Sequence, residues 1–294
     1  MLRFERGQRT EDDDRLAEEV PVAMHFNGES FAVMMATPAD LEDFARGFAL
    51  TEGKVESLDD IEAIEVREVL EGITVDVRVL VGTRFSGESG PPQAGTPGSA
   101  GIADEVGSYR ATHTDMHDPL GANPVGDARR RQLPGRSGCG ICGSRELEDV
   151  VRHPEPVGTG PTVTPDAIER ALEMLRATQP INAFTGSVHA AGWALPDGTL
   201  LTVREDVGRH NALDKLIGAL LAAHVDTRDG FVVITSRASY EMVTKAAVAG
   251  ITIVVAISAP TALAVHLAVD CGVTLAGFAR PGRFNVYSRP QRIG

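Results

Sequence analysis

The chain has 294 residues, of which 43% are hydrophobic and 23% are charged, so it is long enough to bury one large core or two smaller ones. Its 28 Lys and Arg residues stand against 41 Asp and Glu residues, which gives a formal net charge of -13. A nucleic-acid or anionic-membrane surface needs a net basic face, so this balance argues against both kinds of partner. A local basic pocket is still compatible with it.

No stretch of the sequence reaches 18 uninterrupted apolar residues, and residues 1–14 mix acidic and basic side chains without an apolar segment. We therefore expect a cytoplasmic protein that does not span a membrane. The chain has three cysteines, two of which lie three positions apart. Such a close pair in a reducing compartment is typical of metal binding or thiol chemistry rather than of a disulfide framework.

The first elements are a tail and a hairpin. Residues 1–19 are highly charged, and we expect them to form a tail. Residues 20–26 and 30–35 are apolar runs joined by Asn27-Gly28, the dipeptide most typical of a tight β-hairpin.

A helix and two strands are predicted next. Thr37-Pro38 predicts the start of the helix, because Pro fits the first helical position, and Gly53 predicts its end. Residues 61–70 and 73–81 alternate apolar and polar side chains, as half-buried strands do. Residues 20–82 therefore predict a small α+β module.

A long polar segment separates this module from the second half. Of residues 86–101, 12 of 16 are Gly, Pro, Ser or Thr, so the segment cannot bury enough apolar surface to fold. We predict a flexible insert over residues 83–137. Residues 138–160 then hold a cysteine loop, a short helix from about Ser144 and a Pro/Gly-rich hinge.

The second half, residues 161–294, alternates helical patterns with short apolar runs. An antiparallel hairpin is expected over 187–195 and 200–204. A helix from Thr164-Pro165 is expected before this hairpin and another around 213–220 after it. Later strands are expected over 231–235, 251–257 and 273–278, with helices between them from Ser239 and over 261–270. Apolar runs between helices are typical of parallel strands covered on both faces, so we predict an α/β domain with a mixed sheet.

The sharpest local motif is Gly-Cys-Gly-Ile-Cys-Gly at residues 138–143. Its glycines allow a tight turn that leaves Cys139 and Cys142 accessible, while Arg136 and Arg145 favour the thiolate form. The pattern indicates a reactive cysteine. A zinc site and a thioredoxin-type redox pair are the alternatives, although a closed zinc site needs a second pair of ligands. We expect the third cysteine, Cys271, to be a small buried core residue.

Polar and cationic residues follow three predicted parallel strands. In an open α/β sheet, ligands bind beyond the carboxyl ends of such strands. The loops there are 235–239, 258–261 and 280–283, and they offer backbone N–H groups, hydroxyls and guanidinium groups to an anion. Arg209 and His210, at the start of another helix, could join them. The sequence therefore predicts a site for a phosphorylated ligand, against the plainer reading that exposed loops are simply polar.

His189 invites comparison with zinc deaminases, whose signature is His-x-Glu followed by Pro-Cys-x-x-Cys. The chain lacks the Glu, and its cysteine pair precedes the histidine, so the general acid/base of a deaminase is missing. His189 is either a hydrogen-bonded strand residue or a proton donor near the thiols. Asp206 is expected to cap the next helix.

Several long motifs occur in one order along the chain and strongly resemble the FdhD family, the sulfur carriers required for formate dehydrogenase activity. They are residues 138–143, residues 185–191 (Thr-Gly-Ser-Val-His-Ala-Ala), residues 205–215 (Glu-Asp-Val-Gly-Arg-His-Asn-Ala-Leu-Asp-Lys), residues 236–242 (Ser-Arg-Ala-Ser-Tyr-Glu-Met) and residues 277–280 (Gly-Phe-Ala-Arg). The resemblance covers about residues 20–82 and 137–290. The chain departs from the family pattern at residues 134–137, where an aromatic and a Ser/Thr run are usual, and in the length of the insert.

The resemblance implies a C-terminal domain of the three-layer cytidine-deaminase-like fold without its zinc site, beside a small N-terminal α+β module. It implies that sulfur passes from a cysteine desulfurase to the protein as a persulfide and then to the molybdenum cofactor in its bis-guanine-dinucleotide form. Cys139 corresponds to the persulfide carrier, and Cys142 would assist it.

The cofactor-contacting segment of the family corresponds to the stretch Phe278, Ala279, Arg280, Pro281, Gly282 and Arg283, which agrees with the prediction from the strand ends. Ser236, Arg237 and Ser258 complete the predicted cofactor site, because serine hydroxyls and planar guanidinium groups bind phosphate. Neither a structural metal nor zinc is expected. A zinc-dependent deaminase-like hydrolase and a non-catalytic cofactor-binding chaperone are the alternative functions. A homodimer is the commonest state for such proteins.

Overall fold

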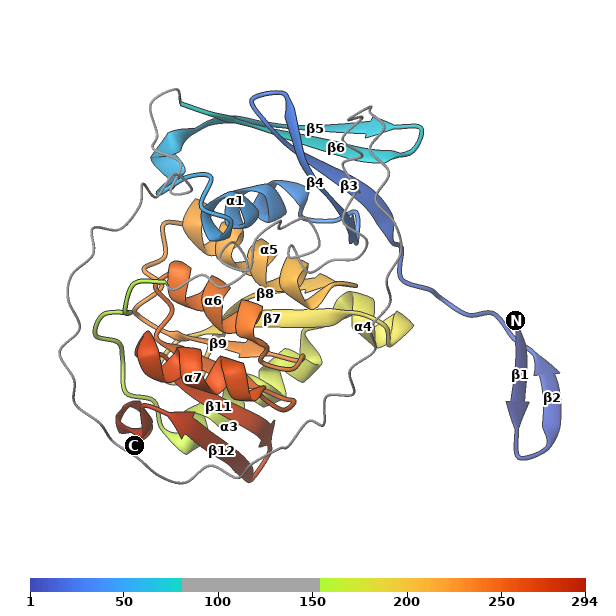
Figure 1. Cartoon of the computed structure of the whole chain (residues 1–294). Coiled ribbons are helices and arrows are strands. Elements are labelled where there is room, and N and C mark those ends of the chain that lie inside the picture. The colour runs from blue at the N-terminus through green and yellow to red at the C-terminus, as the bar shows by residue number, and fades with distance from the viewer. Residues whose placement is uncertain (81–153) are drawn as a thin grey trace, which may run out of the picture. The chain divides into compact units, whose positions relative to one another are not determined.

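The computed structural model describes residues 1–80 and 154–294 (Figure 1). The predicted insert, Cys139, Cys142 and the helix expected from Ser144 lie outside the described residues, so they stay predictions. The two described ranges belong to one structural unit, in which the N-terminal module contacts the C-terminal domain.

The charged N-terminal tail carries a hairpin that its composition does not predict. β1 (Leu2–Glu5) and β2 (Gln8–Glu11) pair antiparallel. Arg6 and Gly7 form the turn between them, with φ of 49° and 82°, as in the turns that suit two-residue hairpins. Every side chain of the two strands is exposed, so this hairpin contributes nothing to a core.

The N-terminal module contains the predicted hairpin, helix and strand pair. Its elements are β3 (Val20–Phe26), β4 (Glu29–Ala36), α1 (Leu41–Thr51), the 3₁₀ helix η1 (Leu58–Asp60), β5 (Ile61–Val69) and β6 (Gly72–Val79). Asn27 and Gly28 form the predicted turn, with φ of 51° and 81°. The sheet order is β4-β3-β6-β5, with β3 and β6 parallel and the other pairs antiparallel.

Helix α1 starts three residues later than Thr37-Pro38 predicts. Its N-cap is Asp40, which has a left-handed backbone with φ of 53°. The backbone of Thr37 binds the C-terminal domain instead of capping the helix. Its N–H donates to Asp206 Oδ2 at 3.0 Å, and its carbonyl accepts from Lys215 Nζ at 2.9 Å. These contacts from the C-terminal domain hold Thr37 outside the helix. Gly53, with φ of 66°, follows the helix end as predicted.

The C-terminal domain confirms the predicted α/β class with a mixed sheet. Its elements are α3 (Pro165–Ala177), α4 (Pro180–Thr185), β7 (His189–Ala194), β8 (Leu200–Asp206), α5 (Arg209–Ala222), β9 (Phe231–Ile234), α6 (Tyr240–Val248), β10 (Ile253–Ala256), α7 (Ala262–Asp270), β11 (Thr274–Arg280), β12 (Arg283–Ser288) and the 3₁₀ helix η2 (Pro290–Arg292). The six strands run in the order β12-β11-β10-β9-β7-β8. β9, β10 and β11 are parallel, whereas β7, β8 and β12 run antiparallel to their neighbours. The sequence did not predict the short helix α4 or the edge strand β12.

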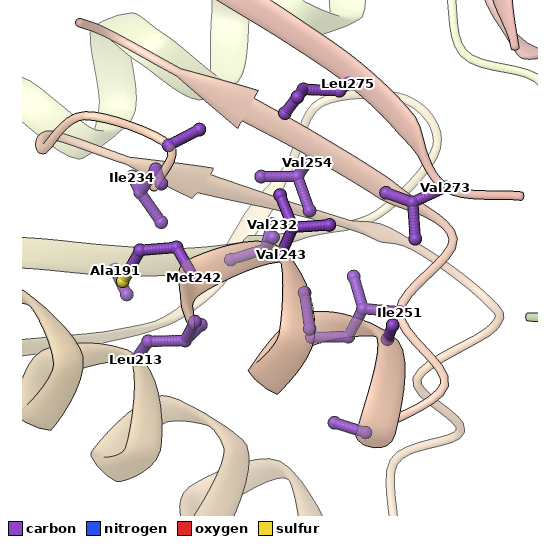
Figure 2. Packing of buried hydrophobic residues seen from close by; sticks show 14 of the residues in the cluster. Ala191, Leu213, Val232, Ile234, Met242, Val243, Ile251, Val254, Val273 and Leu275 are labelled. Carbon is purple, nitrogen blue, oxygen red and sulfur yellow. The ribbon is translucent and has the colours of Figure 1, made fainter. Parts of the chain in front are cut away.

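Helices cover both faces of this sheet. Helix α3 packs on one face, where Ile168, Leu172 and Leu175 meet the inward side chains of the strands. Helices α5, α6 and α7 cover the other face. Figure 2 shows part of that second core, with side chains of β9, β10 and β11 beside Met242 and Val243 of α6. The domain therefore has three layers, as a sheet with two apolar faces requires.

The described part of the predicted hinge is held against the C-terminal domain. Val157 N–H donates to Cys271 O at 2.8 Å, and Arg292 Nη2 donates to Gly158 O at 3.0 Å. Cys271 itself is buried at the end of α7, as predicted. None of the helices in the two described ranges is long and apolar enough to cross a membrane.

The two parts of the unit meet where α1 crosses α5 (Figure 1). Gly47 and Gly218 lie at this crossing. A Cβ atom on Gly47 would lie 1.8 Å from the carbonyl oxygen of Asp214, and one on Gly218 would lie 1.9 Å from that of Asp43. Real Cβ atoms do not approach backbone so closely, so only glycine at both positions allows these helices to touch backbone to backbone.

Two buried lysines bind carboxylates at the same crossing. Lys215, which is fully buried, lies 2.6 Å from the equally buried Asp206. The Asp206 carboxylate also accepts from Thr37 N–H and from Asn211 Nδ2 at 3.0 Å each. Part of the 205–215 motif is therefore structural, because a buried charge is tolerated only when it is paired and fully hydrogen-bonded.

The second lysine joins three helices. Lys245 Nζ on α6 donates to Thr51 Oγ1, Glu52 Oε1 and Asp214 Oδ2, each at 2.9 Å. Burial raises the pKa of Asp214 against the pull of this lysine. Burial also opposes the charge on Lys245, but Asp214 and Glu52 outweigh it and raise the pKa of Lys245 above its ordinary value. Lys245 and Asp214 therefore each favour the charged form of the other in their buried surroundings.

We expect Gly218→Ala to destabilise the protein. Alanine is the better helix former by about 1 kcal/mol, but its methyl group would force two helix backbones apart, and such overpacking costs about 1–3 kcal/mol or more. The urea midpoint should fall with the m-value unchanged. Gly158→Ala is the control, since a Cβ there meets nothing within 4 Å. An equal midpoint for both variants would contradict the close crossing.

Lys215→Met should cost about 3–5 kcal/mol, because it leaves the Asp206 carboxylate buried and unpaired. Arg176→Met on the exposed side of α3 is the control and should change the unfolding free energy by less than about 0.5 kcal/mol. Urea unfolding followed by circular dichroism measures both. The double variant Asp206→Asn, Lys215→Met should recover part of the loss, and a loss that the second substitution only increases would argue against the pairing.

Candidate functional site

The three predicted strand-end loops lie side by side. Ile257 N–H, just after β10, donates to Ile234 O at the end of β9 at 2.9 Å. Ala238 N–H donates to Ala259 O at 3.2 Å, and Phe278 N–H donates to Ser258 O at 3.0 Å. These bonds join the carboxyl-terminal parts of β9, β10 and β11 in order. The loops in which the sequence predicts a ligand site therefore lie together at the carboxyl ends of the parallel strands, which we call the carboxyl edge of the sheet.

The residues predicted to bind the ligand differ in their exposure and in whether their polar atoms are already hydrogen-bonded. Arg237 and Arg283 are exposed, and Ser258 is half-buried. Ser236 is buried, with Oγ donating to the carbonyl of Arg237 at 3.1 Å, so its hydroxyl is used inside the loop. Ala279 packs in the core under α3 and can offer only its backbone. The exposed cations at this edge are therefore the groups suited to an anion.

Phe278 has an unusual backbone. Its φ is 53°, in the left-handed region that a bulky aromatic residue rarely adopts, and it lies in an irregular stretch between Gly277 and Arg280. The residue is 48% exposed. Such strain persists only where the surroundings hold it, and the Ser258 hydrogen bond is one such restraint. The strand therefore turns a large aromatic side chain out of the core at the predicted ligand site.

Hydrogen bonds hold Arg280 and the turn that follows it in place. Arg280 Nη1 donates to Ile257 O and to Ala279 O, so this guanidinium group links β11 to the loop after β10. Pro281 and Gly282 form the turn into β12, where Gly282 has φ of 81° and donates its N–H to Glu169 Oε1 at 2.8 Å. The turn is thereby anchored to α3. Arg283, just beyond it, is the exposed cation of this segment.

A second group of polar residues lies at the same edge, where β7 begins beside the end of β9. His189 Nδ1 is 3.5 Å from Thr235 Oγ1. Thr235 Oγ1 also accepts from Ala190 N–H at 2.9 Å, which fixes the threonine against β7. The pairing of β7 with β9 thus brings His189 to the loop that holds Ser236 and Arg237. The sequence singled out His189 but did not connect it with Thr235.

Arg209 and His210, which the sequence placed at a helix start, begin α5. His210 is buried, with Nε2 3.9 Å from Glu241 Oε2 in the first turn of α6. The neighbouring imidazole of His210 lowers the pKa of Glu241 to about 2. The sequence did not single out Glu241, although an acidic residue in the first helical turn is a usual dipole partner and is a signal that could have found it.

The protonation of His189 follows from its surroundings. Burial lowers the pKa of His189, and the neighbouring Arg209 and His210 lower it further, against a smaller opposing effect of Asp206. His189 is therefore neutral at neutral pH. Among residues 1–80 and 154–294, no three His, Cys, Asp or Glu side chains cluster closely enough to hold a metal ion. The predicted thiols Cys139 and Cys142 lie outside the described residues.

Comparison with known proteins gives one consistent result. The sequence model of the FdhD/NarQ family matches residues 17–119 and 99–294. The sulfur carrier protein FdhD of Xanthomonas campestris pv. campestris (strain B100) is 48% identical over 293 residues, covering 99% of this chain and 90% of its own. The protein of the same name from Cupriavidus necator is 44% identical, covering 100% of this chain and 88% of its own.

A solved structure is similar in fold. It is the crystal structure of a "putative formate dehydrogenase accessory protein" from Desulfotalea psychrophila, with a TM-score of 0.69 and 23% sequence identity. The alignment covers 100% of this chain and 97% of that one. At this identity the likeness supports the overall fold alone.

The Glu241–His210 contact should make stability depend on pH. The pKa of Glu241 is about 2 in the folded protein, below its ordinary value of 4.5, so the carboxylate stabilises the fold above pH 4.5 and this contribution is lost as the pH falls toward 2. Wild type should therefore exceed Glu241→Gln in melting temperature at neutral pH, with a gap that closes in acid. Glu173→Gln, exposed on α3, is the control. A gap that is constant with pH would contradict the assignment.

Proposed function

The chain belongs to the FdhD/NarQ family, and we propose that it is a sulfur carrier that passes sulfur from a cysteine desulfurase to the molybdenum cofactor needed for formate dehydrogenase activity. The observation that carries this proposal is the Gly-Cys-Gly-Ile-Cys-Gly motif, residues 138–143, in a chain that matches proteins named sulfur carrier protein FdhD over nearly its whole length. Reversible sulfur transfer needs an accessible thiolate, which this motif is suited to supply.

Cys139 is the proposed persulfide carrier. Its thiolate attacks the terminal sulfur of the desulfurase persulfide, the S–S bond of that persulfide breaks, and the desulfurase thiolate leaves. The products are a Cys139 persulfide and a free desulfurase cysteine, with no net oxidation. Cys142, three residues on, assists as a second thiol. The flanking glycines give the loop the freedom to approach both donor and acceptor.

The acceptor is proposed to be the molybdenum cofactor in its bis-guanine-dinucleotide form, bound as a substrate at the carboxyl edge of the sheet. Three features of that edge support this. The exposed ring of Phe278 suits stacking on a planar heterocycle, and the exposed guanidinium groups of Arg237 and Arg283 suit phosphate oxygens. The backbone of Ser258, Pro281 and Gly282 would line the site. Arg280, Ser236 and Ala279 would act by holding the loops in place.

We also propose that the C-terminal domain is a cytidine-deaminase-like fold used for binding rather than for zinc chemistry. A mixed sheet between α3 on one face and α5, α6 and α7 on the other supports the first part. A cytoplasmic location and a homodimer are further parts of the proposal, and light scattering after gel filtration tests the dimer.

Cysteine variants test the carrier role. After incubation with a cysteine desulfurase and cysteine, mass spectrometry of the wild-type protein should show one added sulfur on Cys139. Cys139→Ala should abolish this, and Cys142→Ala should reduce but not abolish it. Cys271→Ala is the matched control, because that thiol is buried and should not take part. Absence of added sulfur from both Cys139 and Cys142 would refute the carrier function.

Arginine and aromatic variants test the acceptor site. Arg283→Ala and Phe278→Ala should each lower activation of formate dehydrogenase about tenfold or more in cells that lack their own carrier. That loss corresponds to one charge-assisted bond or one stacking contact worth about 1.5 kcal/mol. Sulfur loading of Cys139 should be unchanged. Arg67→Ala, exposed on β5, is the control. Full activation by both site variants would exclude this edge as the acceptor site.

A further inference from the structure

Arg209, the first residue of α5, is a half-buried arginine whose side chain has no partner in the described ranges. Its Nε atom is shielded from solvent and makes no hydrogen bond. Within residues 1–80 and 154–294, the guanidinium group also forms no ion pair and no hydrogen bond to a carbonyl or hydroxyl oxygen. Because the residue as a whole is only half-buried, a small molecule can reach it from solvent.

The other half-buried arginines of the described ranges are all bonded. Arg46 and Arg204 bind carboxylates, whereas Arg280 and Arg292 donate to carbonyl oxygens. A shielded donor without an acceptor destabilises a protein, and more so when the group is charged. The exception at Arg209 therefore points to an acceptor that a ligand brings.

Arg209 lies at the carboxyl edge of the sheet. Strand β8 ends at Asp206, which pairs with His189 at the start of β7, and α5 begins three residues after Asp206. His189 Nδ1 is 3.5 Å from Thr235 Oγ1, in the loop that continues to Arg237. In the strand order, β7 separates β8 from β9, so Arg209 and Arg237 lie on the two sides of β7 at one edge.

The start of α5 favours a negative charge. The N–H groups of a first helical turn carry a partial positive charge. No side chain caps α5 at Gly208, and its first turn holds no acidic residue. The charge of Arg209 adds to this, and it lowers the pKa of His189, although burial of the imidazole has the larger effect.

The carboxylates of the neighbouring elements have other partners. Asp206 on β8 lies 2.6 Å from Lys215 Nζ, and its charge is thereby balanced. Glu241 on α6 lies 3.9 Å from the imidazole of His210. Neither is ion-paired with Arg209, so the positive charge of this arginine is left for an anion.

We propose that Arg209 and the start of α5 bind a phosphate group of the nucleotide arm that extends away from Phe278, a position that we call the second phosphate site. This inference rests on the proposed function, because a bis-guanine-dinucleotide ligand has two nucleotide arms and so two diphosphates. Neighbouring strands lie about 4.8 Å apart, so the four spacings from β11 to β8 give the carboxyl edge a length of roughly 19 Å. Arg237 and Arg283 hold one diphosphate, and Arg209 holds the other with its planar guanidinium group.

Pyrophosphate is the probe for this site, titrated by calorimetry into the full-length protein. The double variant Arg237→Gln, Arg283→Gln serves as the background, because it removes the other exposed cations of the edge. In that background, Arg209→Gln should weaken pyrophosphate binding about tenfold or more, as expected for the loss of a charge-assisted hydrogen bond. Arg176→Gln, exposed on α3, is the control and should not change the affinity. Equal affinity with and without Arg209 would overturn the proposal.

The melting temperature without ligand separates binding from a structural role. Removing an unpaired charge from the positive end of a helix should leave the melting temperature of Arg209→Gln equal to that of the wild type or higher. Added pyrophosphate should raise the melting temperature of the double variant but not that of the same protein with Arg209→Gln. A clear fall for ligand-free Arg209→Gln would show that the guanidinium group stabilises the fold, and it would also overturn the proposal.

The ring-proton NMR signals of His189 report where the anion binds. Pyrophosphate and guanosine diphosphate should both shift them in the double variant, and neither should do so after Arg209→Gln. A shift with pyrophosphate but not with guanosine diphosphate would mean that the site takes a free inorganic anion. That outcome would overturn the assignment to a nucleotide arm.

Sulfur loading of Cys139 distinguishes a failure of this inference from a failure of the carrier function. Loading should be the same in Arg209→Gln as in the wild type. Normal loading together with pyrophosphate binding that does not depend on Arg209 would overturn the second phosphate site alone. Absence of loading in the wild type would refute the carrier function, whereas Arg209-dependent binding of both probes would still support the second phosphate site.

Discussion

The contact between α1 and α5 is the constraint on which the rest of the structure depends. Gly47 and Gly218 let the two helix backbones touch, and at that separation the lysines 215 and 245 are sealed from water. Each then needs a carboxylate, which Asp206 and Asp214 supply. A wider crossing would admit water to these ion pairs, whereas the close approach keeps them buried, so the charges must be paired.

This crossing also sets the geometry of the proposed ligand site. Asp206 ends β8 and binds Thr37 of the N-terminal module, so the module holds the point at which the sheet leads into α5. Arg209 begins that helix, and His189 pairs with Asp206 across the two strands. A change in how the N-terminal module docks would therefore move the residues that surround His189.

In the strand-end loops, some polar side chains hold the loops together and others are exposed at the proposed ligand site. Arg280 and Ser236 are the kinds of residue that bind phosphate in many proteins, yet here their polar atoms are bonded to neighbouring carbonyls. This bracing keeps the backbone of Phe278 in its strained conformation and leaves Arg237 and Arg283 exposed. The proposed binding of a large phosphorylated cofactor benefits from such rigidity, because loops that are already ordered lose less entropy on binding.

Local patterns in the sequence determined the hairpin at Asn27-Gly28, the alternation of helices and strands in the second half, the mixed sheet and the family, and they predicted a ligand site at the carboxyl ends of the parallel strands. Those features depend on residues close together in the chain or on the general geometry of parallel strands. Only the tertiary structure decided that α1 begins after Thr37, that the 205–215 motif serves mainly as a buried ionic link, and that His189 meets Thr235. The contacts of Thr37 and of His189 join residues 46 to 178 positions apart, and burial and charge pairing of this kind are not recorded by any local pattern.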